Sequence, residues 1–145
     1  MKSLHLFRWS TGLWLGAMLF FTFAITPSLF GSLDKEIAGN VVSLLFPNFY
    51  TACHIGFGLT LVAGLLALRG GARRVLAGLF LVFVAWSMGP LLNQLYLGPE
   101  MRALKAAGDQ AGFSRLHGLS MILNLLSMIL LLVAPLFPTT RPRAK

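Results

Sequence analysis

Four long runs of apolar residues, separated by shorter polar links, dominate the hydrophobic pattern of this chain. They cover residues 9–30, 49–68, 75–97 and about 116–137. A helix of about 20 apolar residues crosses the hydrocarbon core of a bilayer, and a helix satisfies its own backbone hydrogen bonds there. The pattern therefore predicts an all-α fold, an integral membrane four-helix bundle that forms a single domain over residues 1–145. The first run is longer than the apolar region of a signal peptide, so we expect it to be retained.

The link between the first two runs is too long and too apolar for a simple turn. It reads GSLDKEIAGNVVSLLFPN, with its charges gathered near the start. The apolar residues from Ile37 to Phe46 suit a helix that lies on the membrane surface, and Pro47 favours an end to that helix. The link therefore predicts a short interfacial helix between spans one and two. In the third link, residues 101–107 favour a short helix, with Gly108 as its stop.

The basic residues divide unequally between the two sides of such a bundle. The N-terminus, the second link and the C-terminus carry basic residues and no acidic ones, whereas the first and third links carry both kinds. The basic residues of the first group are Lys2, Arg8, Arg69, Arg73, Arg74, Arg141, Arg143 and Lys145. Cytoplasmic loops carry the excess of Lys and Arg, so we expect both termini in the cytoplasm and the protein in the cytoplasmic (inner) membrane of a bacterium.

Composition narrows the classes of function. The chain is 57% hydrophobic and 11% charged, with a net charge of +8, whereas about 25% of a soluble globular chain is charged. Because the basic residues flank apolar runs, membrane orientation explains them and nucleic acid is not an expected partner. The expected partners are the lipid bilayer and, where the helix faces allow it, other membrane subunits or a second copy. The single cysteine, Cys53, excludes an intrachain disulfide.

Small residues recur four apart in the first two spans. Gly12 and Gly16 form a GxxxG pattern, and Ala52 and Gly56 have the same spacing. Membrane helices approach each other closely at such positions. We therefore expect these residues at contacts between spans.

A polar stripe runs along the fourth span, within FSRLHGLSMILNLLS. His117, Ser120, Asn124 and Ser127 recur at spacings of three and four, which places them on one helix face. Polar side chains are costly in lipid, so this face is expected to point into the bundle. With a rise of about 1.5 Å per residue, Asn124 is expected roughly 10 Å deeper than His117, which then lies near the outer surface.

Polar residues of the second and third spans are placed to meet this stripe in the outer half of the membrane. Pro90 can kink the third span and free a backbone carbonyl there. The predicted ligand-binding or polar network consists of His117, Ser120, Asn124, Asn93, Gln94, Tyr50 and His54. Such a network either fixes helix packing or forms a site for a small ligand, a metal or a transported species.

Metal and cofactor chemistry rests on few residues. His54, His117 and Cys53 are of the types that bind copper or zinc, and His54 with His117 is the pair that a bis-histidine haem would need. No cofactor is predicted outright, and copper, zinc and haem stay open. The spans contain no carboxylate and the chain no Gly-x-Ser-x-Gly motif, so no catalytic residue is predicted. A non-enzymatic membrane protein with a ligand or transport site is preferred, and the alternatives are an accessory subunit of a membrane complex and a haem-binding oxidoreductase.

The order of several motifs resembles one family. RWSTGLWLGAMLFFTFAITPSLF, IAGNVVSLLFPNFY, GPLLNQLY and FSRLHGLSMILNLLS are similar to segments of the transmembrane-protein-205-like family, also described as domain of unknown function 4149. The resemblance covers nearly the whole chain and implies four helices in a membrane, without an agreed activity. Eukaryotic relatives are linked to resistance to platinum drugs, which implies the handling of soft metals, metal tolerance, or trafficking. The motif positions in this chain are Pro27, Gly39, Pro47, His117, Ser120 and Asn124.

Overall fold

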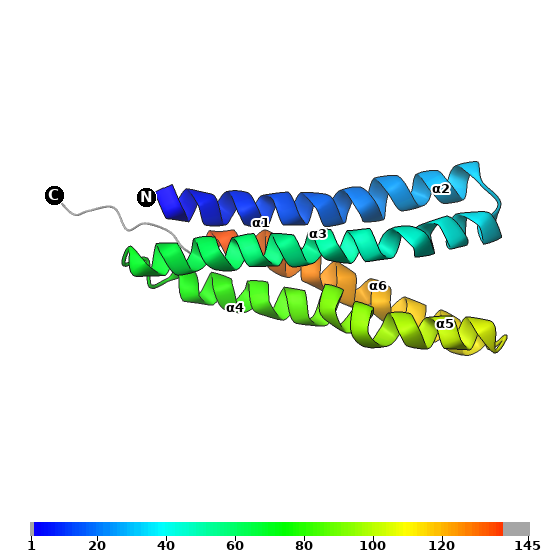
Figure 1. Cartoon of the computed structure of the whole chain (residues 1–145). Helices are drawn as coiled ribbons and strands as arrows, with labels where there is room; N and C mark the ends of the chain where they lie inside the picture. The colour runs from blue at the N-terminus through cyan, green and yellow to red at the C-terminus, as the bar shows by residue number, and fades with distance from the viewer. Residues whose placement is uncertain (1, 138–145) are drawn as a thin grey trace.

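The chain folds into four long helical spans that lie side by side (Figure 1). The structure is a computed structural model and describes residues 2–137. All four spans are long and apolar enough to cross a membrane, which confirms the predicted all-α membrane bundle. Span 1 contains α1 (Lys2–Phe20), η1 (Phe21–Ile25) and α2 (Thr26–Ser32), and span 2 is α3 (Lys35–Arg69). Span 3 contains α4 (Val75–Trp86), η2 (Ser87–Leu91), η3 (Asn93–Leu97) and α5 (Gly98–Ala106), and span 4 contains α6 (Gln110–Val133) and η4 (Ala134–Leu136).

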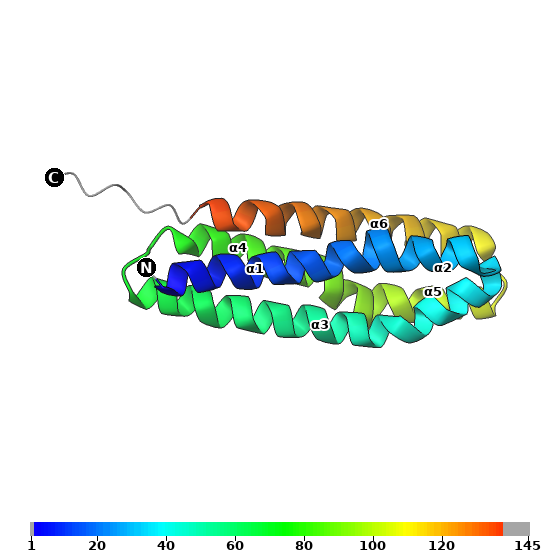
Figure 2. The same cartoon turned by 90° about the horizontal axis from the view of Figure 1, so that it is seen from above.

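The spans form a ring in which each one has two neighbours. Span 1 packs between spans 2 and 4 and lies opposite span 3, as the view from above shows (Figure 2). Large apolar side chains cover the outside of all four spans; Leu44, for example, is 76% exposed and Trp9 70%. A helix that is apolar on its outer as well as its inner face is stable in lipid, not in water. The protein is therefore an integral membrane protein.

The turns at the two ends of the bundle are built differently. At one end lie the start of α1, the end of span 4 and the turn between α3 and α4, where Gly71 adopts a φ of 86°. At the other end Gly108, with a φ of 74°, ends α5, and Asp109 accepts a 2.9 Å hydrogen bond from the backbone N–H of Gly112 to cap α6. Both described chain ends thus lie on the side of the basic second link. Arg141, Arg143 and Lys145 lie outside the described residues.

The short interfacial helix predicted in the first link is wrong as a separate element. Residues 37–46 are helical, but they form the first turns of α3, which continues through Pro47 to Arg69. The reason is tertiary, because aromatic rings on both sides of the proline pack on one ring of span 1. Phe46 and Phe49 lie 5.6 and 4.4 Å from Phe21, measured between ring centroids. Membrane helices tolerate an internal proline when neighbouring groups compensate for it.

The first three helical spans are longer than the apolar runs from which they were predicted. The predicted spans 9–30, 49–68 and 75–97 each lie within one helical span, and 116–137 extends one residue beyond η4. The 35 residues of α3 correspond to about 52 Å, compared with about 30 Å for the hydrocarbon core. The short helix predicted near residues 101–107 is present as α5, although it is continuous with span 3. The helix α3 is therefore longer than the hydrocarbon core is thick.

Glycines allow the closest approaches between spans in the half of the bundle near the α3–α4 turn. A Cβ added to Gly56 would lie 2.7 Å from the Cβ of Trp14, and one added to Gly64 would lie 2.9 Å from Leu79 Cγ. Gly56 thus packs as predicted. Gly12 and Gly16 do not, because both are exposed and an added Cβ would meet nothing within 4 Å. Their GxxxG pattern faces away from the bundle.

Candidate functional site

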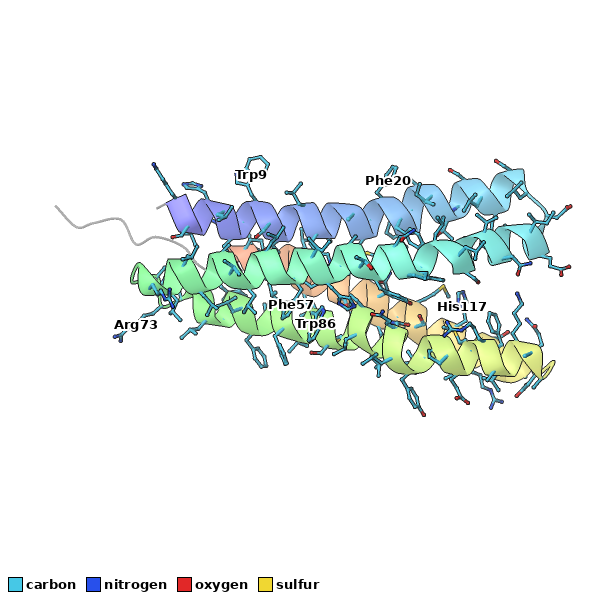
Figure 3. The ribbon with its side chains drawn as sticks, viewed as in Figure 1. Trp9, Phe20, Phe57, Arg73, Trp86 and His117 are labelled. Carbon is cyan, nitrogen blue, oxygen red and sulfur yellow. The ribbon has the colours of Figure 1, made fainter. Side chains whose placement is uncertain are left out.

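A chain of three polar side chains joins spans 2 and 3 in the middle of the bundle. The indole Nε1–H of Trp86 donates to His54 Nδ1 at 2.9 Å. His54 Nε2 lies within hydrogen-bond distance of Gln94 Oε1. Trp86 also stacks on Phe57, with ring centroids 4.3 Å apart and planes 8° apart (Figure 3). The histidine is therefore held between a partly buried aromatic pair and one amide.

These partners determine the tautomer of His54. An indole nitrogen can only donate, so Nδ1 must be the acceptor and carries no proton. In the neutral ring the proton then resides on Nε2, which donates to the side-chain amide oxygen Oε1 of Gln94. Both ring nitrogens are occupied, and a metal ion at either one would displace a hydrogen bond.

Asn93 is the buried centre of a second set of bonds. Its amide nitrogen donates to the carbonyl oxygen of Gly89 at 2.7 Å, and its amide oxygen accepts from the hydroxyl of Ser120 on span 4. Only 4% of the Asn93 side chain is exposed. A buried amide satisfied on both sides orients the helices that it joins. Adjacent residues thus face different neighbours, Asn93 facing span 4 and Gln94 facing span 2.

A third bond joins span 4 to span 1. The amide nitrogen of Asn124 donates to the hydroxyl of Thr22 at 3.2 Å. Ser127, one turn further along α6, donates to the carbonyl of its own helix at Leu123. Side-chain hydrogen bonds therefore connect span 2 to 3, span 3 to 4 and span 4 to 1. We call the seven side chains the polar belt: Thr22, His54, Trp86, Asn93, Gln94, Ser120 and Asn124.

The helices depart from α geometry at the polar belt. The three π-helical segments in the described residues are η1, η2 and η3, of five residues each. Segment η1 contains Thr22, η2 contains Gly89, whose carbonyl accepts from Asn93, and η3 contains Asn93 and Gln94. Well under 1% of residues in globular proteins are π-helical, and such turns are frequent at functional sites. Three π-helical segments at the polar belt distinguish the backbone geometry of this level from that of the rest of the described bundle.

Three of the residues predicted from sequence lie outside the polar belt. His117 is exposed and stacks on Phe113 of its own helix, with centroids 5.7 Å apart. Tyr50 stacks on Phe46 at 5.6 Å. Cys53 is fully buried in the apolar core with Trp14. The structure thus brings together His54, Asn93, Gln94, Ser120 and Asn124, and it places the other three elsewhere.

The predicted metal ligands are not gathered. In the part of the chain that the structure describes, no group of three or more His, Cys, Asp or Glu side chains is arranged to hold a metal ion. His54, His117 and Cys53 therefore do not form a three-ligand site in this structure. His54 lies between Trp86 and Gln94, whereas Cys53 points into the core.

Sequence reasoning missed Thr22 and assigned no polar partner to Trp86. Thr22 lies in the apolar run LFFTF, where its hydroxyl is the single polar side chain. Trp86 lies too deep in its span for an interface residue, which is the signal that it faces the bundle. The carbonyl of Gly89 carries no sequence signal, because the carbonyl that Pro90 would free in an α-helix lies four residues before the proline, at Trp86.

Comparisons with known proteins place the chain in a family. It matches the family model described as "Domain of unknown function (DUF4149)" over residues 9–110, which include most of span 1 and all of spans 2 and 3. It is 31% identical over 118 residues to an uncharacterized protein of Aquifex aeolicus (strain VF5), and the match covers 81% of this chain and 83% of that protein. No solved structure matches the chain.

Proposed function

We propose that this chain, which belongs to the family described as Domain of unknown function (DUF4149), is a non-enzymatic membrane protein whose polar belt binds a small, neutral, hydrogen-bonding ligand within the bilayer. We also propose that the chain belongs, within this family, with the transmembrane-protein-205-like proteins. This assignment is supported by the order of the motifs in spans 1 to 4.

The observation that carries the proposal is the coincidence of the polar belt with the three π-helical segments. A π-turn replaces α hydrogen bonds with less favourable ones and persists only where the surroundings enforce it. Here the backbone N–H of Thr26 reaches Phe21 O, and that of Gly98 reaches Asn93 O. The other half of the bundle has close glycine contacts between spans and, in the described residues, no π-helical segment. Distorted turns that present polar groups support a role beyond packing.

The chemistry of the belt favours a neutral ligand. Its members are hydroxyl, amide, indole and imidazole groups, without a carboxylate, ammonium or guanidinium among them. An ion inside the bilayer needs an opposite charge or several dipoles aimed at it. The belt instead offers both donors and acceptors, and Gln94 brings one amide to the exposed surface of span 3. A neutral molecule with donors and acceptors of its own would exchange bonds with the belt at little cost.

Small molecules that co-purify with the protein from its native membrane test the proposal. The extract of wild-type protein would be compared by mass spectrometry with extracts of Asn93→Leu and Gln94→Leu. Thr51→Val is the matched control, because Thr51 is polar, exposed and bonded only to its own helix at Pro47 O. We expect one neutral species with wild type and control, and its loss from both belt variants.

Equal extracts from all four proteins would contradict the proposal and leave the belt as a packing device. Thermal unfolding in detergent is measured in parallel, so that loss of a ligand is separated from loss of the fold. A stoichiometric protein partner in the same preparation would instead support the alternative role as an accessory subunit.

We also propose the orientation, with both ends of the chain in the cytoplasm of a bacterial cell. The support is the basic end of the bundle, where Arg69, Arg73 and Arg74 flank the turn between α3 and α4. A topology reporter fused at Gly71 should read cytoplasmic and one fused at Ala107 should read external. An external reading at Gly71 would reverse the orientation.

A further inference from the structure

An open groove runs along the side of α1 that faces away from the other spans. Its floor contains Gly12 and Gly16, and Trp9 and Phe20 rise from it. Figure 3 shows Trp9 and Phe20 projecting from the same side of α1, away from the bundle. Trp9 is 70% exposed and Phe20 62%. The groove therefore faces away from the other described parts of the chain, on the side of α1 exposed to lipid.

The glycine floor has no role in the packing of the described chain. A Cβ at either Gly12 or Gly16 would meet nothing within 4 Å, whereas one at Gly56 or Gly64 would collide with a neighbour. Glycine is unfavourable in a helix by about 1 kcal/mol relative to alanine. Two exposed glycines between large aromatic side chains make a recess that fits something outside the chain.

One end of the groove is basic. His5 and Arg8 line it, and Arg8 Nε donates to the carbonyl oxygen of Pro135 at 3.3 Å, which holds the guanidinium at the end of span 4. Lys2 and the arginines of the α3–α4 turn lie at the same end of the bundle. The acidic residues Asp34, Glu36, Glu100 and Asp109 lie toward the opposite end.

We propose that this groove is a binding site for an anionic phospholipid. The phosphate lies at Arg8 and His5, and one acyl chain lies over Gly12 and Gly16 between Trp9 and Phe20. Basic residues near a membrane surface attract anionic lipids, and arginine pairs well with phosphate oxygens. The length also fits, because the twelve helical rises from Arg8 to Phe20 add up to about 18 Å, close to one leaflet of an approximately 30 Å core.

Charge favours lipid over a second copy of the chain in the same groove. Two copies in one membrane share their orientation, so a symmetric pair of α1 helices would bring Arg8 beside the Arg8 of the other copy. Such a pair would place like charges together at the basic end, without an acidic side chain nearby. A phosphate removes this repulsion, whereas a second α1 creates it.

Quenching of Trp9 fluorescence by brominated lipids tests the proposal. The full chain is reconstituted in phosphatidylcholine vesicles that contain phosphatidylglycerol, with bromine on the acyl chains of one lipid or the other. The contribution of Trp9 is the difference between wild type and Trp9→Phe. We expect Trp9 to report about a fivefold enrichment of phosphatidylglycerol over its mole fraction, the factor that one basic residue near the surface supplies.

Substitutions test separately the charge of Arg8 and the recess over the glycines. Arg8→Gln should abolish the enrichment and Arg8→Lys should retain it. Gly16→Leu fills the recess and should lower it, whereas Gly58→Leu is the matched control, because Gly58 lies in α3 and an added Cβ also meets nothing within 4 Å. Because a Cβ has open space at both glycines, we expect the fold to tolerate either change.

Three results would contradict the proposal. In the first, both brominated lipids quench Trp9 according to their mole fractions in the wild-type protein. In the second, Gly12→Cys forms a disulfide-linked dimer in phosphatidylcholine vesicles, which would assign the groove to a second copy. Retention of the enrichment in Arg8→Gln would also contradict the assignment of the phosphate to Arg8.

Discussion

The two halves of the bundle hold their helices together by different means. Near the α3–α4 turn the helices are regular, and glycines bring neighbours together: Gly56 against Trp14, Gly64 against Leu79, and Gly78 against Phe7 and Ala134. At the polar belt the helices contain π-turns, and side-chain hydrogen bonds join the spans in addition to one close glycine contact, Gly89 against Ser127. Arg8, bonded to Pro135 O, is the exception at the first end.

The difference shows what each kind of contact provides in lipid. Lipid tails are as apolar as leucine, so burial alone gives little drive for helices to associate, and close van der Waals contact has to supply it. Glycine contacts are tight, but they offer no polar group that could bind a ligand. Hydrogen bonds in the belt are individually weak and directional, and they leave groups that can exchange partners. Stability is thus expected to depend more on the glycine contacts and function more on the belt.

The largest expected effect is at the glycine contacts. A Cβ at Gly78 would lie 2.7 Å from the carbonyl oxygen of Ala134 and 3.1 Å from the ring of Phe7. Because a backbone oxygen cannot rotate away, Gly78→Leu should lower the free energy of unfolding by about 3 kcal/mol or prevent folding. Thermal unfolding in detergent measures this, with Gly58→Leu as the tolerated control. A stable Gly78→Leu protein would contradict the conclusion that the glycine contacts hold this half of the bundle together.

The next effect is at the buried centre of the belt. Asn93→Leu removes the bonds to Gly89 O and to Ser120 and leaves both groups without that partner. The expected loss is about 1–2 kcal/mol, the scale of hydrogen bonds between membrane helices. Ser43→Ala is the control, because Ser43 is exposed and bonds only to its own helix at Gly39 O. A loss as large as that of Gly78→Leu would show that the belt also carries the stability.

A smaller effect is expected at the bond between Trp86 and His54. Trp86→Phe keeps an aromatic ring against Phe57 and removes the N–H that donates to His54 Nδ1. A double-mutant cycle with His54→Leu should give a coupling of about 0.6 kcal/mol, the average measured between membrane helices. Zero coupling would mean that the ring stack alone holds Trp86.

The smallest effect on stability is expected within the polar stripe of span 4, where His117 and Asn124 can be compared. His117 is exposed and contacts Phe113 of its own helix, so His117→Ala should leave the unfolding midpoint unchanged. Asn124→Leu loses the bond to Thr22 and should lower the midpoint by a small but measurable amount. A larger effect at His117 than at Asn124 would contradict the placement of the stripe.

Several features were predictable because they depend on local pattern alone. The four spans follow from the apolar runs that begin near residues 9, 49, 75 and 116. The helix α5 follows from the helix-forming residues of the third link and from Gly108 as their stop. The stripe at Ser120 and Asn124 follows from spacing. The continuity of α3 through Pro47 was not predictable, because it depends on Phe21, a residue of another span.

The polar contacts show the same division. Sequence spacing placed Ser120 and Asn124 on one face of span 4, but it did not show that Ser120 meets Asn93 whereas Asn124 meets Thr22. Gly12 and Gly16 have the same spacing as Ala52 and Gly56, yet Gly56 packs against Trp14 and the first pair faces lipid. One helix has several faces, and a motif does not state which neighbour it meets.

The sequence by itself determined that the chain is a four-span membrane protein, because hydrophobicity and chain length are properties of each segment alone. It also determined which end of the bundle is basic. Only the tertiary structure decided where the helices widen into π-turns, which polar side chains pair, and which glycines are open. These features arise from packing between spans that are far apart in the chain, where each partner selects the geometry of the other.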